Sequence, residues 1–499
     1  MNWPPQRVEK CSDVVDNQSN IYAHYHPYHH HKKMAVAAGN HYTLAVGKNG
    51  EAYAWGLGTF GQLGLGDDAC TQEPKRHPTR ISSISKPVRQ VAANVRHTGL
   101  VTDDGELFMC GDNEHGQIGL GKLPHRTTPT LLKRPLFRGE AIAMVACGHA
   151  CTAALTEGGS VYTFGRGNRG ALGHGDKLSQ SKPTLVQGLV GKKIVMVAVG
   201  GAHMVALSDQ GHVYTWGDDE CKQLGHGDAG LQVKPRQVDP KWFPAGDAVV
   251  FIAAGSEHTA AVTASGRLYT WGEGGATGQY DTEDKKVPTL VPPDIFRGAS
   301  VVSVACGHKQ TLALTAGGQL WACGWNREGQ LGLGDEEDRT VFERVDETCF
   351  FLPGVNETDT HDQSFKGQKV VAVSAGVFHS MAVTADGTLF GLGSSKHYAL
   401  GHGPRSFNLM YGGPSFTRPL EIVHRTLRDA RIGRFLGGQP KADDFALAFA
   451  MSLHGRLGAG SVASGMEEGL VQMILDQSEY SFLGGAGAGV GLRRLLGFT

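Results

Sequence analysis

Short apolar strands alternate with glycine-rich turns along most of the chain. The clearest copy, Ala52 to Asp67, is a strand that ends in Trp55-Gly56 and leads to the turn Gly-Gln-Leu-Gly-Leu-Gly-Asp. The glycine after the Trp position marks each copy: Gly56, Gly111, Gly165, Gly217, Gly272, Gly324 and Gly393. These marker glycines are spaced by 55, 54, 52, 55, 52 and 69 residues. Self-similarity at a nearly fixed period predicts one body of seven stacked units.

Each unit contains four predicted strands. The first ends near a glycine, and the second begins three residues later at one of seven positions: Tyr42, His97, Cys151, His203, His258, Gln310 and His379. A tight turn such as Asn49-Gly50 leads to the third strand. A segment with proline, such as Lys182 to Val186, is typical of an edge strand. Seven such units predict an all-β, seven-bladed propeller over residues 34–453, with a β-solenoid as the alternative.

The pattern changes at both ends of the repeats and at one place within them. Residues 1–33 are predicted to be a disordered, His-rich arm, and residues 454–499 a glycine-rich tail with a short amphipathic helix. Ile432 to Ser452 resembles the first two strands of an eighth unit, which either completes the ring or replaces a strand from residues 34–46. The fifth turn has lost its Leu-Gly pair, and Glu336 to Gln368 is predicted to be an insertion.

Composition narrows the function classes. Glycine is 71 of 499 residues, about twice the usual share, and the excess lies mainly in the repeated turns. The net charge of -1 gives no reason to expect nucleic-acid binding. The nine cysteines are expected to be reduced structural thiols. Because the sequence has neither a signal peptide nor a long apolar run, we expect a cytoplasmic or nuclear monomer.

The recurring motifs resemble the RCC1 (regulator of chromosome condensation) repeat family over about residues 34 to 420. The motifs are Gly-x-x-His-Thr/Ser at a strand start, Tyr-x-Trp-Gly at a strand end and Gly-Gln-Leu-Gly-x-Gly-Asp in the turn. The resemblance implies a seven-bladed propeller. It also implies a candidate activity, nucleotide exchange on the small GTPase Ran, which in that subgroup depends on a Ser-Phe-Arg-Asp-x-Asn-Gly wedge.

No turn of this chain contains that wedge. The second turn, Asp112-Asn-Glu-His-Gly116, shares only its Asp and Gly. The basic N-terminal tail expected for chromatin docking is replaced by His-rich residues. We therefore assign no catalytic residue on the strength of the resemblance.

The sequence offers no separate catalytic or cofactor site. The histidines His97, His203, His258 and His379 hold matching places in separate units, so they are predicted to be structural. The glycine-rich turns lack the Lys-Ser/Thr of a phosphate-binding loop. We expect no metal or cofactor.

The first functional hypothesis is a non-enzymatic scaffold that binds a protein partner through loop tips. Arg and Trp are enriched at interface hot spots. The candidate residues follow the marker glycines of copies three, four and six: Arg166, Asn168, Arg169, Asp218, Asp219, Glu220, Trp325, Arg327 and Glu328. The alternatives are an exchange factor for a small GTPase and an adaptor for ubiquitin ligation, since Met466 to Leu475 is faintly similar to the start of an F-box.

Overall fold

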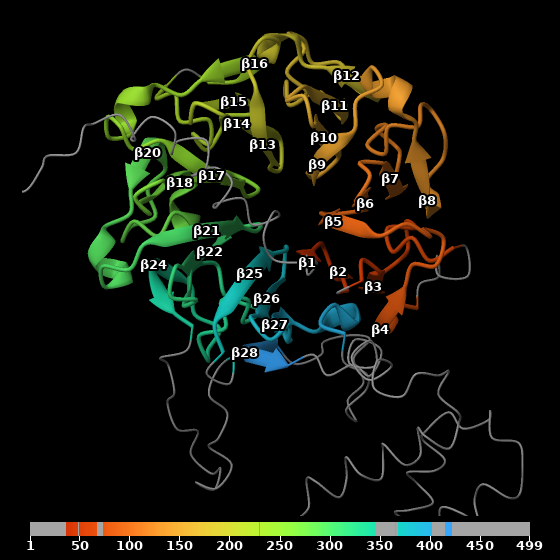
Figure 1. Ribbon diagram of the computed structural model, residues 1–499. Helices are drawn as coiled ribbons and strands as arrows, with labels where there is room; N and C mark the ends of the chain where they lie inside the picture. Colours follow the sequence, from red (N-terminus) through yellow and green to blue (C-terminus); the bar gives the residue numbers. More distant parts are fainter. Residues whose placement is uncertain are drawn as a thin grey trace, which may run out of the picture. The chain divides into compact units, whose positions relative to one another are not determined.

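Seven four-stranded antiparallel sheets form the blades of a propeller (Figure 1). The computed structural model describes residues 36–47, 49–66, 73–228, 230–345, 365, 368–401 and, for the backbone alone, 415–421. All four strands of each blade are consecutive in sequence. The predicted fold class is thereby confirmed. The arm of residues 1–33, the segment 432–452 and the tail of residues 454–499 lie outside the described residues.

Equivalent strands occupy equivalent places in every blade. The innermost strands are β1 (Val36–Ala38), β5 (Val88–Ala93), β9 (Ile142–Cys147), β13 (Ile194–Val199), β17 (Val249–Ala254), β21 (Val301–Cys306) and β25 (Val370–Ala375). The second strands are β2 (Tyr42–Val46), β6 (His97–Thr102), β10 (Cys151–Thr156), β14 (His203–Ser208), β18 (His258–Thr263), β22 (Gln310–Thr315) and β26 (His379–Thr384).

The remaining strands complete each blade toward the rim. The third strands are β3 (Ala52–Gly56), β7 (Leu107–Gly111), β11 (Val161–Gly165), β15 (Val213–Gly217), β19 (Leu268–Gly272), β23 (Leu320–Gly324) and β27 (Leu389–Ser394). The outer strands are β4 (Lys75–Arg80), β8 (Arg126–Leu132), β12 (Gln180–Leu185), β16 (Gln232–Gln237), β20 (Lys285–Leu290), β24 (Arg339–Arg344) and β28 (Ser415–Glu421). Short 3-10 turns are η2 (Arg134–Phe137), η3 (Gln187–Leu189), η4 (Pro240–Trp242), η5 (Gly274–Ala276), η6 (Pro293–Phe296) and η9 (Lys396–Tyr398).

The hydrophobic core lies between neighbouring blades. One cluster, for example, combines Leu155 and Leu172 of blade three with Met204 and Trp216 of blade four. Every residue of the second strand β14 is buried, because both of its faces meet other sheets. Each blade therefore depends on its neighbour for burial of apolar surface, which is the main stabilising term.

A turn glycine brings each blade close to the next. Gly225 of blade four has φ +75, and a Cβ placed there would lie 2.8 Å from Nε1 of Trp271 in blade five. Gly173 and Gly401 stand in the same relation to Trp216 and Trp55. The glycine-rich turns thus serve backbone conformation and close approach between blades.

Hydrogen bonds between blades seven and one close the ring, and one of them matches the Trp216–Ala171 bond between blades three and four. The indole Nε1 of Trp55 in blade one donates a hydrogen bond to the carbonyl of Ala399 in blade seven (2.8 Å). The backbone N–H of Ala38 donates to Oγ of Ser374 (3.0 Å). Strand β1 occupies the innermost place of blade one, so the described strands close the ring without a strand from residues 432–452.

One local prediction changes. The predicted insertion, Glu336 to Gln368, begins too early, because its first part contains the outer strand β24. That strand was overlooked because it lacks the proline found in the other outer strands. The altered fifth turn keeps its place against blade six: the backbone N–H of Tyr280 donates to the carbonyl of Thr340 (2.8 Å).

The close approach of blades predicts a graded loss of stability for two nearby glycines. Gly227 has φ +72 and nothing within 4 Å of its would-be Cβ, so Gly227→Ala should cost only the strain of positive φ, about 1–2 kcal/mol. Gly225→Ala should cost about 1–3 kcal/mol more, because the methyl group collides with Trp271. Urea unfolding of both variants measures the difference. Equal losses would contradict the packing role of Gly225.

Candidate protein-binding face

One face of the propeller carries the seven marker glycines, and we call it the marker face. The turns between first and second strands and the loops between third and fourth strands emerge there. Gly217, for example, pairs with His203 at the start of β14. Its φ is +105, and a Cβ would lie 2.4 Å from the carbonyl oxygen of Ala202. The marker glycine therefore allows the third strand to end directly beside the preceding turn.

The recurring histidines lie immediately behind this face and link neighbouring blades. Nε2 of His97 in blade two lies 2.8 Å from Oγ1 of Thr152 in blade three. That hydroxyl donates its single proton back to the carbonyl of Gln117 in blade two (2.7 Å). It must therefore accept from the histidine, so Nε2 carries a proton.

The same relay occurs at three further junctions. The histidine–threonine pairs are His203–Thr259, His258–Thr311 and His379–Thr43, and the last of these closes the ring. Burial lowers the pKa of His97 to about 4 and the pKa of the other three histidines to about 3. These histidines are neutral structural donors, in agreement with their predicted structural role.

The residues in front of this relay differ from blade to blade. Three residues lie between the end of each first strand and the start of the second, and the last two of them form a variable pair. In chain order the seven variable pairs are Asn40-His41, Val95-Arg96, His149-Ala150, Gly201-Ala202, Ser256-Glu257, His308-Lys309 and Val377-Phe378. Arg96 and His149 are exposed, and most of the others are half-buried. The marker face is thus a uniform framework with a variable surface.

An aromatic group covers the junctions of blades six, seven and one. The rings of His41 and Phe378 stack with centroids 4.7 Å apart, and the edge of Trp325 meets Phe378 at 5.9 Å. His397 contacts His41 edge-on at 4.9 Å. Burial, followed by the charges of His397 and Lys396, lowers the pKa of His41 to about 4. This group presents a partly exposed and largely uncharged surface.

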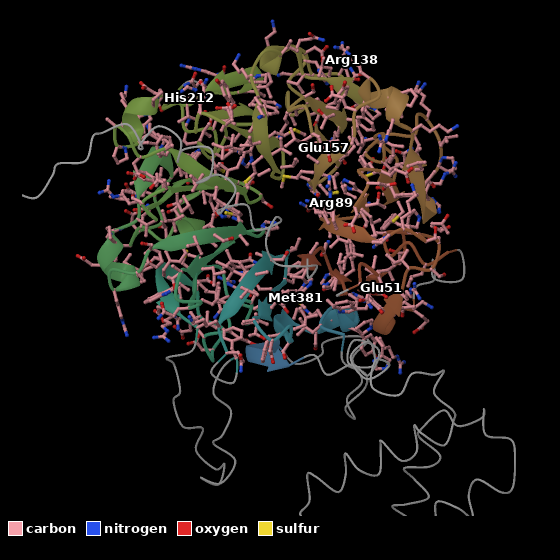
Figure 2. All side chains as sticks on the ribbon, in the orientation of Figure 1. Glu51, Arg89, Arg138, Glu157, His212 and Met381 are labelled. Atoms are coloured by element: carbon pink, nitrogen blue, oxygen red, sulfur yellow. The ribbon has the colours of Figure 1, made fainter. Side chains whose placement is uncertain are left out.

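Ion pairs bridge several other junctions of the marker face. Arg169 of blade three contacts Asp218 and Glu220 of blade four, each at 2.7 Å. Lys309 of blade six contacts Glu273 of blade five at 2.8 Å. On the opposite face, Arg89 pairs with Glu157 at 3.6 Å, and both are labelled beside the ring axis in Figure 2. Exposed pairs contribute at most about 1 kcal/mol each, so these contacts mainly orient side chains.

The loop-tip residues predicted from sequence fall into three groups by exposure. Arg166, Asn168, Glu220 and Arg327 are exposed. Trp325, Arg169 and Glu328 are half-buried, and Asp218 and Asp219 are buried.

The two buried aspartates serve internal contacts. Oδ1 of Asp219 accepts the backbone N–H of Leu224 (3.0 Å), and burial raises the pKa of its carboxyl group. Asp218 accepts from Arg169. Their role in partner binding stays a prediction.

Sequence reasoning missed several exposed or half-buried residues of the marker face. His41, Arg96, Lys309 and Phe378 lie in the variable pairs, one residue before the recurring start of the second strand. An alignment of the seven copies with each other would have revealed them. The signal is a variable column beside an almost constant one.

Nothing in the described residues indicates metal chemistry or a membrane span. Within them, no three or more His, Cys, Asp or Glu side chains lie together as metal ligands would. The helices of this part of the chain are all too short or too polar to cross a bilayer.

Family models recognise the repeats. The RCC1-like domain matches residues 124–411, which is more than half of the chain. Two models of the regulator of chromosome condensation (RCC1) repeat match residues 49–101 and residues 35–62 and 88–117. The chain belongs to the RCC1 family.

Two curated relatives show the range of RCC1-family proteins that resemble it. The ultraviolet-B receptor UVR8 of Arabidopsis thaliana is 36% identical over 318 residues, which cover 62% of this chain and 69% of UVR8. The E3 ubiquitin-protein ligase HERC2 of Homo sapiens is 34% identical over 353 residues, which cover 70% of this chain and 7% of HERC2. The chain thus spans only a small part of HERC2.

Solved structures agree with the propeller fold. Human WBSCR16 superposes with a TM-score of 0.60 at 27% identity, covering 70% of this chain and 86% of WBSCR16. Yeast RCC1 (Prp20), solved with Kap60, superposes with a TM-score of 0.63 at 22% identity, covering 86% of this chain and 92% of Prp20. The second likeness concerns the fold alone.

The buried relay predicts a pH dependence of stability. Because the folded pKa of His203 is lowered to about 3, the unfolded chain takes up a proton first as the pH falls. The stability due to the neutral ring is therefore present above pH 6.5 and is lost progressively toward pH 3. Between pH 7 and pH 5 one such histidine should lower the free energy of unfolding by about 2 kcal/mol.

His203→Gln tests this, because blade six already uses Gln310 at the same place. We expect the variant to fold at pH 7 and to lose about 2 kcal/mol less than the parent between pH 7 and pH 5. Urea unfolding at both values provides the measurement. His125→Gln, in an exposed loop, is the matched control. An unchanged pH dependence in His203→Gln would refute the neutral relay.

Proposed function

We propose that this protein is a non-enzymatic scaffold whose marker face binds a protein partner. One observation carries the proposal: residues of the seven variable pairs differ between blades, whereas the residues packed behind them recur. A face that served only the fold would have no need of arginine, lysine, glutamate and phenylalanine at equivalent places. Variable loops on a rigid framework are a common arrangement for binding.

The surface chemistry of the marker face suits a protein partner. Half-buried Trp325 and Phe378 offer apolar contact area beside exposed Arg327. Aromatic residues and arginine are enriched at interface hot spots. We assign partner contact to the exposed predicted residues Arg166, Asn168, Glu220 and Arg327, and to the variable pairs next to them.

Exchange on a small GTPase is the second candidate. The propeller resembles that of Prp20, whose structural study concerns its binding to Gsp1p and histones. Since that likeness is at 23% identity, it supports a shared fold and leaves the activity to experiment. A role beside a ubiquitin ligase, suggested by the name of HERC2, is the third candidate. We expect each role to be carried out in the cytoplasm or nucleus by a monomer.

Site-specific photo-crosslinking tests the use of the marker face. A benzophenone residue placed at His149, Asn168 or Arg327 should capture the same partner from extract, and mass spectrometry should identify one protein for all three positions. The control is the benzophenone residue placed at Lys133 or Lys193. Both positions are exposed in connections between successive blades, which lie on the opposite face. Capture of that partner only from Lys133 and Lys193 would contradict the proposal.

The second candidate has its own assay. Release of labelled nucleotide from Ran and a panel of other small GTPases should not be accelerated by micromolar protein if the scaffold proposal is correct. Acceleration that is lost in marker-face variants would establish exchange as the function and replace the non-enzymatic role.

A further inference from the structure

On the marker face, the junction of blades two and three lacks the cation–carboxylate pair that three other junctions have among the described residues. Junctions three–four, five–six and six–seven each hold a cation against a carboxylate of the adjacent blade: Arg169–Asp218, Lys309–Glu273 and Lys396–Glu328. At junction two–three, Arg96, His149 and Arg166 are all exposed. Among the described residues, none of these three forms an ion pair with a carboxylate.

These three cationic or basic side chains lie close together. The backbone N–H of Arg166 donates to the carbonyl of Ala150, directly after His149 (2.8 Å). The guanidinium of Arg96 lies over the ring of Phe60 in blade one at 4.2 Å, which fixes its position on the marker face. Burial lowers the pKa of His149, and the charges of Arg166, His308 and Arg96 lower it further. The two arginines therefore place positive charge beside His149.

A hollow of about 700 Å³ lies beside this group, between the outer loops of the same two blades. Its wall includes Asp112, His115, Lys122, Leu123 and Ser179. Hydrogen bonds connect two residues of this wall to the backbone at or next to each arginine. The N–H of Asp112 donates to the carbonyl of Arg96 (2.8 Å), and the N–H of Gly167, next to Arg166, donates to Oγ of Ser179 (3.2 Å).

Two exposed leucines lie in or next to the lining of the hollow. Leu123 is 45% exposed, and Leu178, which precedes Ser179, is 66% exposed. They are two of the five large hydrophobic side chains that are exposed in the described part of the chain. Exposed leucines that flank a hollow are typical of a surface that a partner covers.

We propose that the junction of blades two and three binds an extended acidic segment of the protein partner. Carboxylates of the segment pair with Arg96 and Arg166, and aliphatic residues beyond them cover Leu123 and Leu178. This inference rests on the proposed scaffold function and gives it a partner chemistry. Arginine suits the role, because its planar guanidinium pairs with a carboxylate through two hydrogen bonds.

A nucleic-acid strand fits the same surface less well. Asp112 and Glu114 lie in the wall of the hollow, where they repel a continuous row of phosphates. An acidic peptide can place its carboxylates over the arginines and apolar residues over the rim. The chain also has a net charge of -1, unlike a typical nucleic-acid-binding domain.

A direct binding assay with model peptides tests the inference on the full chain. The probes are dye-labelled peptides with glutamates at one end and leucines at the other, in both orders, and matched peptides with lysine or glutamine in place of glutamate. Fluorescence anisotropy should show binding of a glutamate peptide that weakens with salt. Arg96→Glu with Arg166→Glu should reduce the affinity at least about tenfold, and Leu123→Asp with Leu178→Asp by a similar factor.

Lys133→Glu with Lys193→Glu changes the net charge equally on the opposite face and should leave binding unchanged. Thermal unfolding confirms that each variant is folded. If the Arg96→Glu with Arg166→Glu variant does not fold, Arg96→Gln with Arg166→Gln takes its place and should also weaken binding. Equal loss in both charge-reversal doubles, equal binding of the lysine peptide, or preferred binding of a labelled single-stranded oligonucleotide would overturn the inference. If the glutamate peptides do not bind while marker-face crosslinking persists, this inference fails and the scaffold function stands.

Discussion

The close approach of each blade to the next is the constraint on which the structure depends. The turn glycines Gly173, Gly225 and Gly401 allow a backbone turn to meet a buried tryptophan ring of the neighbouring blade. Beside them, Nε2 of each relay histidine hydrogen-bonds to a threonine hydroxyl of the next blade. A larger residue in place of one of these glycines would collide with the neighbouring blade.

This constraint separates the residues that can vary from those that cannot. The second strands are buried between sheets, and their starting residues recur as His, Tyr, Gln or Cys. One residue earlier, the side chain leaves the blade junction for the marker face. Arginine, lysine, glutamate or phenylalanine can stand there without affecting blade packing. The propeller thus presents seven variable positions around one axis.

The sequence predicted the framework far better than the surface. Marker glycines, tight turns and edge prolines each have a local physical cause, so their repetition gave the blades correctly. Strand β24 was missed because nothing in Arg339–Arg344 has such a local signature. Asp218 and Asp219 were placed on exposed loop tips, but their loop folds back and buries both. Contacts such as Arg169–Asp218 depend on the spacing of blades, which local sequence does not encode.

The central claim is that recurring residues build the ring while the variable pairs bind the partner. Grafting the small Gly201-Ala202 pair of blade four into the other six blades tests it most directly. The account predicts a folded propeller, with a free energy of unfolding close to that of the parent, that no longer binds its partner. A grafted chain that fails to fold, or one that keeps full partner affinity, would contradict it.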